Sequence, residues 1–252
     1  MRLLILGGTA DGRQLAEVLH QQGIPLIYSV AGLVRTPKVG CEVVSGGFRQ
    51  FGGLAEYSQQ QGITAILDAT HPYAAKMSTT AVSAAKSCGI PCWRFYREPW
   101  QETSADSWKK FSKWKDLTAA LSDKKRLFMT VGQVEQEYLE QVAGKSERVL
   151  LRTAVAPKIN LPNNVEWIKA IGPFTEEDEY TLMQQYNIDA LVSKNSGGDS
   201  TVAKLFAARK LKIPVYMLER PVLEAADKIF IDKKCCEQYV LNQFSQATTK
   251  TR

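Results

Sequence analysis

The chain has 252 residues, of which 44% are apolar and 23% are charged, and its formal net charge is +6 at pH 7. This composition predicts a soluble globular protein with one large or two smaller domains. No apolar run approaches the ~18 residues that a membrane-spanning helix needs, and the first run is too short for a signal peptide, so we expect a cytoplasmic protein that contacts no membrane. The five cysteines form no C-x-x-C pair, which argues against disulfides and against a metal site.

The excess of basic side chains is shared evenly between the first 100 residues and the rest. A basic surplus can indicate nucleic acid, a membrane surface or an acidic small molecule. The densest basic run is interleaved with aromatic residues, and we interpret it as a solvated connector rather than as a nucleic-acid surface; it comprises Trp108, Lys109, Lys110, Phe111, Lys113, Trp114 and Lys115.

The first stretch, RLLILGGTADGR, predicts a buried strand, a glycine-rich turn and a helix start. Gly7 and Gly8 would let a pyrophosphate approach the backbone N–H groups, and Gly12 would complete a degenerate dinucleotide fingerprint. We include Asp11 of the same turn in the expected cofactor site. A nucleoside triphosphatase loop is excluded, because Arg13 and Gln14 replace its lysine and its magnesium-binding hydroxyl.

The second expected strand, residues 24–30, ends without an acidic residue. Enzymes that use NAD place Asp or Glu at this point to accept a hydrogen bond from the ribose, whereas NADP enzymes supply basic or hydroxyl groups. Ser29, Gly32 and Arg35 therefore favour NADPH, although Arg35 could also be an ordinary surface residue.

Two further segments reach the same expected sheet edge. Val43 and Val44 lead into a second glycine bend that contains Gly47 and Phe48. The expected strand of residues 63–68 ends in the polar cluster Asp68 to Tyr73, where ligands of open α/β sheets bind. His71 in this cluster is a candidate ligand contact, with a structural hydrogen bond to a backbone carbonyl as the alternative.

A polar, irregular stretch at residues 101–112 predicts the boundary between a nucleotide-binding domain, residues 1–100, and a substrate domain, residues 101–252. Strand and helix patterns alternate beyond it. One expected helix begins after Thr175, which forms a capping box with Asp178. Because acidic residues already occupy this helix start, we assign it a structural role.

The loop after the expected strand of residues 190–192 gathers small residues, amide donors and lysines at a helix start. This chemistry suits a carboxylate or phosphate, although a cap with a tight turn is the alternative. The candidate substrate residues are Lys194, Asn195, Ser196, Gly197, Gly198, Thr201 and Lys204.

Several segments together resemble the precorrin-6A reductase family of cobalamin biosynthesis: LGGTADGR at 6–13, SVAG at 29–32, GGF at 46–48, DATHPYA at 68–74, IGPFT at 171–175 and KNSGG at 194–198. The resemblance implies an α/β fold of two Rossmann-like domains with mainly parallel sheets facing a central cleft, with strand exchange in some members. It also implies reduction of precorrin-6A to precorrin-6B by a hydride from NADPH, or reduction of the cobalt-containing counterpart with NADH.

By position, the resemblance places these residues around the cofactor: Gly7, Gly8, Thr9, Arg13, Ser29, Gly47, Phe48, Thr70 and His71. It places residues 194–197 against the tetrapyrrole. The reaction also needs a proton, for which His71, Tyr73 and Lys194 are candidates. We expect a monomer or a weak homo-oligomer.

The sequence leaves two alternative functions. A reductase or epimerase of sugar nucleotides is disfavoured, because no tyrosine is followed by lysine four residues later. A non-enzymatic NADPH sensor or nucleic-acid-binding module would bind without turnover.

Overall fold

The computed structural model of the protein describes residues 1–31 and 39–249. Within them, twelve strands form two six-stranded sheets, and every strand pairing is parallel. The expectation of an α/β fold with parallel sheets is confirmed. The strands are β1 (Leu3–Leu6), β2 (Leu26–Val30), β3 (Glu42–Ser45), β4 (Ala65–Asp68), β5 (Cys92–Phe95), β6 (Trp108–Phe111), β7 (Arg126–Thr130), β8 (Arg148–Thr153), β9 (Val165–Lys169), β10 (Ala190–Lys194), β11 (Val215–Leu218) and β12 (Lys228–Phe230).

Helices connect most of these strands, as parallel pairing requires. They are α1 (Ala10–Gln21), α2 (Leu54–Gln60), α3 (Ala75–Cys88), α4 (Trp114–Ala120), α5 (Gln136–Ala143), α6 (Glu176–Gln185), α7 (Ala203–Lys210) and α8 (Lys233–Thr249), with the 3-10 turns η1 (Phe48–Phe51) and η2 (Asp199–Thr201).

The chain divides into two compact units. Unit 1 comprises Met1–Arg97 and Pro221–Arg252, and unit 2 comprises Glu98–Arg220. The prediction that residues 101–252 form one domain is therefore wrong for the C-terminal segment. The reason is that β12 pairs with β5, and Val240 and Phe244 of α8 are buried in the core that α1 also covers.

The two sheets have the same strand order, and in each the strand at the sixth position is out of sequence order. The first sheet has the order β3-β2-β1-β4-β5-β12, and the second has the order β9-β8-β7-β10-β11-β6. Counted by position, the strand order of both sheets is the order 3-2-1-4-5-6 of dinucleotide-binding sheets. However, β6 follows β5 in the sequence and pairs with β11, whereas β12 follows β11 and pairs with β5.

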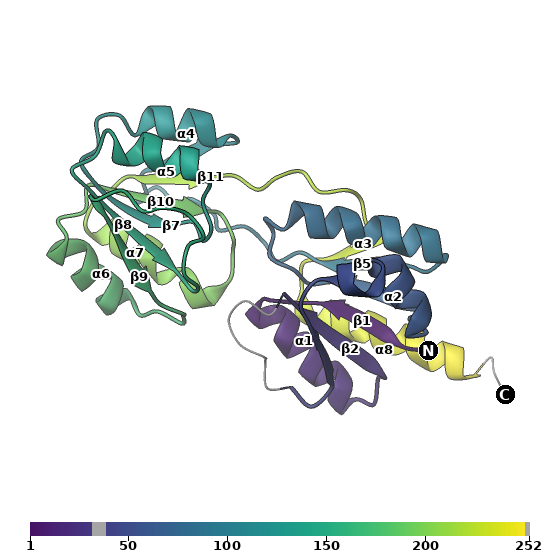
Figure 1. The fold of residues 1–252 in the computed structure, drawn as a ribbon. Coiled ribbons are helices and arrows are strands. Elements are labelled where there is room, and N and C mark those ends of the chain that lie inside the picture. The colour runs from purple at the N-terminus through teal and green to yellow at the C-terminus, as the bar shows by residue number, and fades with distance from the viewer. Residues whose placement is uncertain (32–38, 250–252) are drawn as a thin grey trace. The chain divides into compact units, whose positions relative to one another are not determined.

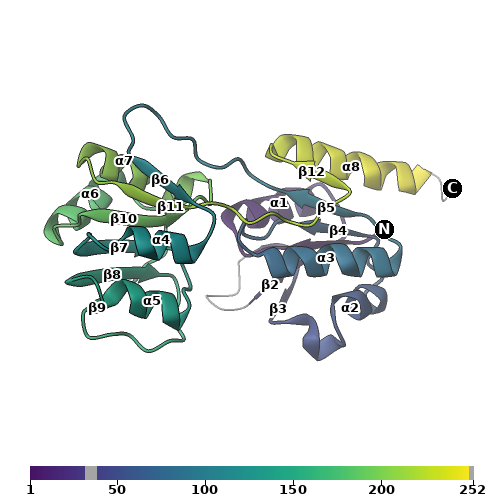
Figure 2. The same cartoon turned by 90° about the horizontal axis from the view of Figure 1, so that it is seen from above.

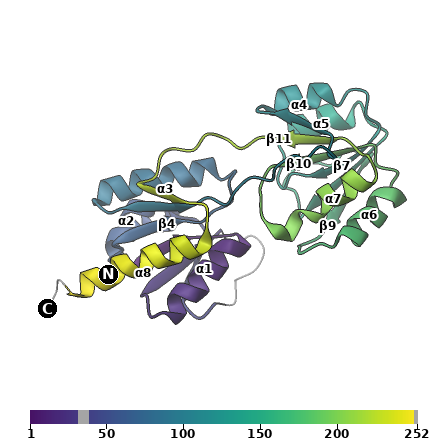
Figure 3. The same ribbon diagram turned by 180° about the vertical axis from the view of Figure 1, so that it is seen from behind.

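In unit 1, α1 and α8 cover one face of the sheet, and α2 and α3 cover the other (Figures 1 and 2). Helices α1 and α8 lie side by side (Figure 3). Successive side chains of β1 point to opposite faces, so that Leu3 and Ile5 pack with the α1 layer while Leu4 and Leu6 pack with the α2 layer. Burial on both faces explains why this strand is a continuous apolar run.

In unit 2, α4 and α5 lie on one face of the second sheet, and α6 and α7 lie on the other (Figure 1). Phe128, Leu191 and Met217 form the core beneath α6 and α7. Thr175 caps α6 by accepting a hydrogen bond from the N–H of Asp178 at 3.1 Å, which confirms the predicted cap.

The predicted connector at residues 101–112 contains a strand, β6, that sequence reasoning missed. It lies at the edge of the second sheet and pairs with β11 on one side. Lys109 and Lys110 at its centre are exposed, so the strand has no apolar run. Lysines on an edge strand hinder pairing with other chains, which gives this basic run a structural role.

In both sheets the strand order reverses beside the first strand. The reversal lies between β1 and β4 in unit 1 and between β7 and β10 in unit 2. Ligands of open parallel sheets bind at the carboxyl ends of the strands at this point. The loops after β1, β4 and β10 carry most of the candidate residues, and each of these three strands lies beside the reversal of strand order in its sheet.

Candidate active-site loops

The glycine turn after β1 has three glycines in different environments. A Cβ on Gly7 would lie 2.2 Å from the ring of Tyr28, and a Cβ on Gly12 would lie 3.1 Å from the backbone oxygen of Ala69. Gly8 has φ +108 and open space where its Cβ would be. The turn therefore packs tightly on two sides and leaves a third open to an approaching ligand.

Tyr28 supports this turn from the neighbouring strand β2. Its hydroxyl accepts a hydrogen bond from the N–H of Gly8 at 3.1 Å, and the backbone oxygen of Ser29 accepts one from Gly7 at 2.8 Å. Burial raises the pKa of Tyr28, which keeps the phenol protonated. Sequence reasoning placed Tyr28 on a strand but did not connect it with the turn, because that contact depends on the pairing of β1 with β2.

Thr9 joins the loops that follow β1 and β4. Its hydroxyl accepts from the N–H of Gly12 at 2.9 Å, which caps α1, and donates to the backbone oxygen of Ala69 at 3.0 Å. The neighbouring Arg13 is exposed on α1. The bond to Ala69 places the start of α1 at the carboxyl ends of β1 and β4. The N–H groups at the start of a helix favour anions.

The loop of residues 69–74, which we call the β4 loop, begins at a buried ion pair. Asp68 and Arg94 are 1% and 3% exposed, and their side chains meet at 2.8 Å. The other carboxylate oxygen of Asp68 accepts from both the N–H and the hydroxyl of Thr70, at 3.1 and 2.6 Å. Thr70 is therefore oriented at the strand end, beside the turn after β1.

His71 is exposed, and its Nδ1 accepts a hydrogen bond from the N–H of Tyr73 at 3.3 Å. The two rings lie 5.7 Å apart. This bond is to a backbone N–H and not to the backbone carbonyl of the alternative interpretation, and it leaves the rest of the ring able to contact a ligand.

The remaining predicted cofactor residues differ in their surroundings. Gly47 precedes η1, and Phe48 packs against Tyr57 with ring centroids 5.1 Å apart. Because Phe48 contributes to the core beside α2, its side chain is largely structural. Gly32 and Arg35 lie outside the described residues.

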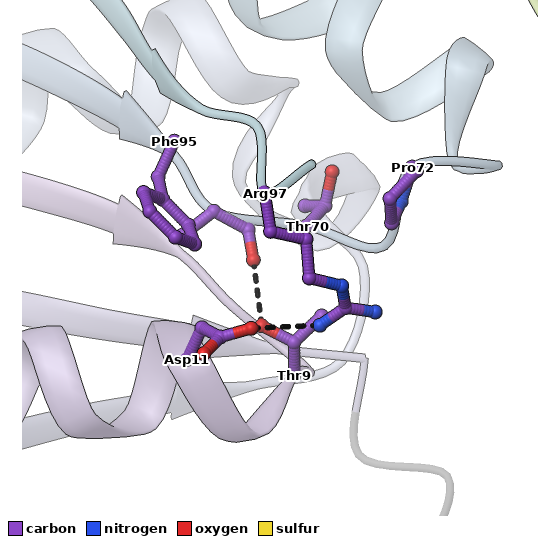
Figure 4. Close-up of a pocket in the computed structure, with 7 residues that line it drawn as sticks. Thr9, Asp11, Thr70, Pro72, Phe95 and Arg97 are labelled. Carbon is purple, nitrogen blue, oxygen red and sulfur yellow. Dashed lines mark hydrogen bonds and ion pairs between the residues drawn. The ribbon is translucent and has the colours of Figure 1, made fainter. Parts of the chain in front are cut away.

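Asp11 forms ion pairs with Arg97 at 2.8 Å and with Lys233 of α8 at 3.2 Å. Burial would raise the pKa of Asp11, but the hydrogen bonds from Arg97 and Lys233 outweigh it and lower the pKa. Arg97 and Asp11 help to line a shallow surface pocket, in which the guanidinium points toward the carboxylate (Figure 4); its other lining residues are Thr9, Ala69, Thr70, Pro72 and Phe95.

Arg97 was missed by the sequence analysis. It follows β5, the strand next to β4, so it reaches the same sheet edge as Thr9 and Thr70. A basic residue two positions beyond the aromatic strand of residues 92–95 was the available signal. Asp11 stays a predicted cofactor contact, and its carboxylate is engaged by two cations.

In unit 2, Lys194 ends β10 and begins the loop of residues 194–198, which we call the β10 loop. Burial lowers the pKa of Lys194. Ser196 is 7% exposed, and Gly197 and Gly198 have φ +63 and +85, a conformation that favours glycine. Thr201 ends η2, at the start of the α7 segment.

Two predicted substrate residues point elsewhere. The side-chain oxygen of Asn195 accepts from the N–H of Trp100 at 2.8 Å, and its side-chain nitrogen donates to the Trp100 oxygen at 3.1 Å. Lys204 is 3% exposed, and its Nζ lies 5.1 Å from the ring centroid of Trp100. The prediction that Lys204 presents its amine to a ligand is wrong in this structure, because α7 turns that side chain inward.

Among the described residues, no helix is both long and apolar enough to cross a bilayer.

Comparison with known proteins gives a consistent result. A family model described as precorrin-6x reductase CbiJ/CobK matches residues 2–240. A precorrin-6A reductase of Rhodococcus erythropolis is 38% identical over 234 residues, 92% of this chain and 94% of the relative. A cobalt-precorrin-6A reductase of Priestia megaterium is 29% identical over 240 residues, 88% and 91% of the two chains. A solved structure of CobK precorrin-6A reductase matches with TM-score 0.86 and 33% identity over 96% of each chain.

Proposed function

The chain belongs to the precorrin-6x reductase family and is a nicotinamide-dependent oxidoreductase, and from this premise we propose that it reduces precorrin-6A to precorrin-6B with NADPH in cobalamin biosynthesis. The observation that carries the proposal is the glycine turn of unit 1, where Gly8 opens onto space, Gly7 leaves no room for a side chain and Gly12 packs tightly against Ala69. That arrangement suits a pyrophosphate at the start of α1.

Unit 1 would hold the cofactor through the turn after β1 and the loop after β4. Backbone N–H groups at the start of α1 would contact the pyrophosphate, and Arg13 and Arg97 would add positive charge. Asp11 would otherwise repel a pyrophosphate, but Arg97 and Lys233 compensate its charge. Thr70 and His71 would face the cofactor from the β4 loop.

The preference for NADPH follows from the end of β2. The residues there, Tyr28 to Ala31, include no acid that could accept from a ribose hydroxyl. Arg35 is the proposed partner of the additional phosphate. The alternative is NADH-dependent reduction of the cobalt-containing substrate, and the Priestia megaterium relative is named a cobalt-precorrin-6A reductase.

The β10 loop of unit 2 would bind the acidic tetrapyrrole. Lys194 is the proposed partner of a carboxylate, since burial disfavours its charge and an anion would restore it. Ser196, Gly197, Gly198 and Thr201 would line the same contact. When bound, the nicotinamide supplies the hydride, and the protein orients the reactants and excludes water. His71, Tyr73 and Lys194 remain the proposed candidates for delivering the accompanying proton.

The function is tested with purified protein, metal-free or cobalt-containing precorrin-6A, and NADPH or NADH. We expect loss of nicotinamide absorbance together with a change in the tetrapyrrole spectrum, with the highest kcat/KM for the metal-free substrate and NADPH. Absence of turnover in all four combinations would contradict the proposed reaction. A preference for the cobalt substrate with NADH would favour the alternative.

The cofactor assignment is tested in the same assay with Arg35→Ala. We expect a higher KM for NADPH and little change for NADH, because only NADPH carries the additional phosphate. Arg49→Ala serves as a control at another arginine of the same unit. Equal effects of Arg35→Ala on both cofactors would remove Arg35 from the proposed phosphate site.

A further inference from the structure

The β10 loop is held by the segment Glu98–Trp100, which precedes β6 in the same unit. Asn195 and Trp100 exchange two hydrogen bonds, from the N–H of Trp100 at 2.8 Å and to its oxygen at 3.1 Å. The indole Nε1 of Trp100 also donates to the backbone oxygen of Gly198 at 3.2 Å. One tryptophan is thus bonded to two positions of the loop.

Two more contacts restrict the backbone of the β10 loop, at Gly197 and at Asn195. A Cβ on Gly197 would lie 2.1 Å from the backbone oxygen of Glu98, so the two backbones meet where only glycine fits. The Nε of Arg220 donates to the backbone oxygen of Asn195 at 2.7 Å. The loop is therefore fixed at several successive residues.

The indole of Trp100 is itself supported from the interior. The amine of Lys204 lies 5.1 Å from its ring centroid, a cation–π distance when the amine is charged. Arg152 and Glu179, which are 8% and 1% exposed, form an ion pair at 2.6 Å in the same buried region. The amine that contacts the indole therefore interacts in turn with a buried ion pair.

We propose that Trp100 and Asn195 are positioning residues of the tetrapyrrole site. They hold the β10 loop in its binding conformation, and Lys194 contacts the substrate. This inference rests on the proposed function of that loop. It changes the role of Asn195, whose amide binds the protein backbone instead of the ligand.

A loop that is ordered in advance does not lose conformational freedom when a ligand binds. Loosening the loop should therefore weaken binding of the tetrapyrrole, with little effect on the cofactor or on turnover at saturation. The effects of two substitutions on the tetrapyrrole KM multiply when the residues act independently and do not multiply when both act through the same loop. A double variant can therefore separate a direct ligand contact from a positioning contact.

The first test compares Trp100→Phe with Trp108→Phe. The first substitution removes the bond to Gly198, whereas the Nε1 of Trp108 is buried without a hydrogen-bond partner among the described residues. Since one hydrogen bond is lost, we expect Trp100→Phe to raise the KM for precorrin-6A roughly threefold to tenfold. The KM for NADPH, kcat and the values for Trp108→Phe should stay near wild type.

The second test adds Asn195→Ala and the double variant. If both residues act through the loop, the double variant should raise the tetrapyrrole KM by much less than the product of the single effects. If Asn195 contacts the substrate directly, the two effects should multiply, and this result would overturn the proposal.

Hydrogen exchange of the amides of residues 194–198, without ligand, gives a readout independent of turnover. We expect faster exchange in Trp100→Phe and Asn195→Ala, and wild-type exchange in Trp108→Phe. Unchanged exchange, or an unchanged tetrapyrrole KM, would overturn the positioning role. A wild-type protein that neither binds nor reduces the tetrapyrrole would instead refute the proposed function, even where the variants loosen the loop.

Discussion

At the scale of single residues, Lys204 shows how far the direction of one side chain can alter an interpretation. It follows the β10 loop closely, yet its amine is buried beside Trp100. Burial, with a smaller contribution from the charge of Arg152, lowers the pKa of Lys204 to about 7, while Glu179 acts in the opposite direction. The lowered pKa of Lys204 is therefore a consequence of its burial in unit 2.

This pKa predicts how stability depends on pH. The unfolded chain binds a proton at Lys204 below about pH 10.5, whereas the folded protein binds it only below about 7. Between these values the unfolded state holds more protons, so this residue makes the protein more stable as pH rises, by up to about 1.4 kcal/mol per pH unit. Below about pH 7 the full cost of burying the charge is present.

Lys204→Met should remove this dependence. We expect the variant to be at least as stable as wild type at pH 7, and its advantage to shrink as the pH approaches 9.5. The measurement is the urea midpoint of both proteins across this range. A difference between them that does not vary with pH would contradict the lowered pKa.

At the scale of elements, α1 and the β4 loop depend on one hydroxyl. Thr9 caps the helix through Gly12 and reaches across to Ala69. The cap was within the reach of sequence reasoning, because a threonine before an amphipathic helix is a common start signal. The bond to Ala69 was not, because it joins residues 60 positions apart.

Thr9→Val should break both contacts while it keeps the shape of the side chain. We expect a loss of about 1 to 2 kcal/mol in the free energy of unfolding. We also expect a higher KM for NADPH, because the glycine turn loses its link to the β4 loop. Urea denaturation and steady-state kinetics measure the two effects.

Thr80→Val is the matched control for this substitution. Its hydroxyl is exposed and donates only within its own helix, to the backbone oxygen of Lys76. We expect a change within about 0.5 kcal/mol and unchanged kinetics. Equal losses in the two variants would show that the bonds of Thr9 have no special weight.

At the scale of the whole molecule, the exchange of sixth strands makes unit 1 depend on the end of the chain. Asp227 accepts from the N–H of Cys92 at 2.7 Å, and Arg94 donates to the backbone oxygen of Glu224 at 2.7 Å. Beyond them, β12 extends the first sheet and α8 covers its core. Unit 2 is one continuous segment, Glu98–Arg220.

A chain that ends at Arg220 should therefore lose the folded state of unit 1 and retain that of unit 2. Without α8, the buried side chains beside α1 would be exposed to water, which removes hydrophobic stabilisation. Hydrogen exchange resolved along the chain measures each unit separately. A chain that ends at Gln246 keeps Val240 and Phe244 and should behave as wild type. Protection of β1 and β4 in the shorter chain would contradict this prediction.

Much of the local structure and the position of the candidate loops could be read from the sequence. The strands β1, β4 and β10 are buried apolar runs, and polar residues or glycines follow each of them. Buried parallel strands have such runs because both their faces are covered. Edge strands β6 and β12 lack them, since much of their surface meets solvent, and both were missed.

By itself, the sequence determined features that depend on neighbouring residues: the glycine turn after β1, the cap at Thr175, and the polar loops at the strand ends. Only the tertiary structure decided which sheet receives β6 and β12, that Arg97 pairs with Asp11, and that Lys204 and Asn195 contact Trp100. The physical reason is the separation in sequence between the residues that interact. Turns and caps form within a few residues, whereas strand partners and buried polar contacts depend on packing between segments far apart in the chain.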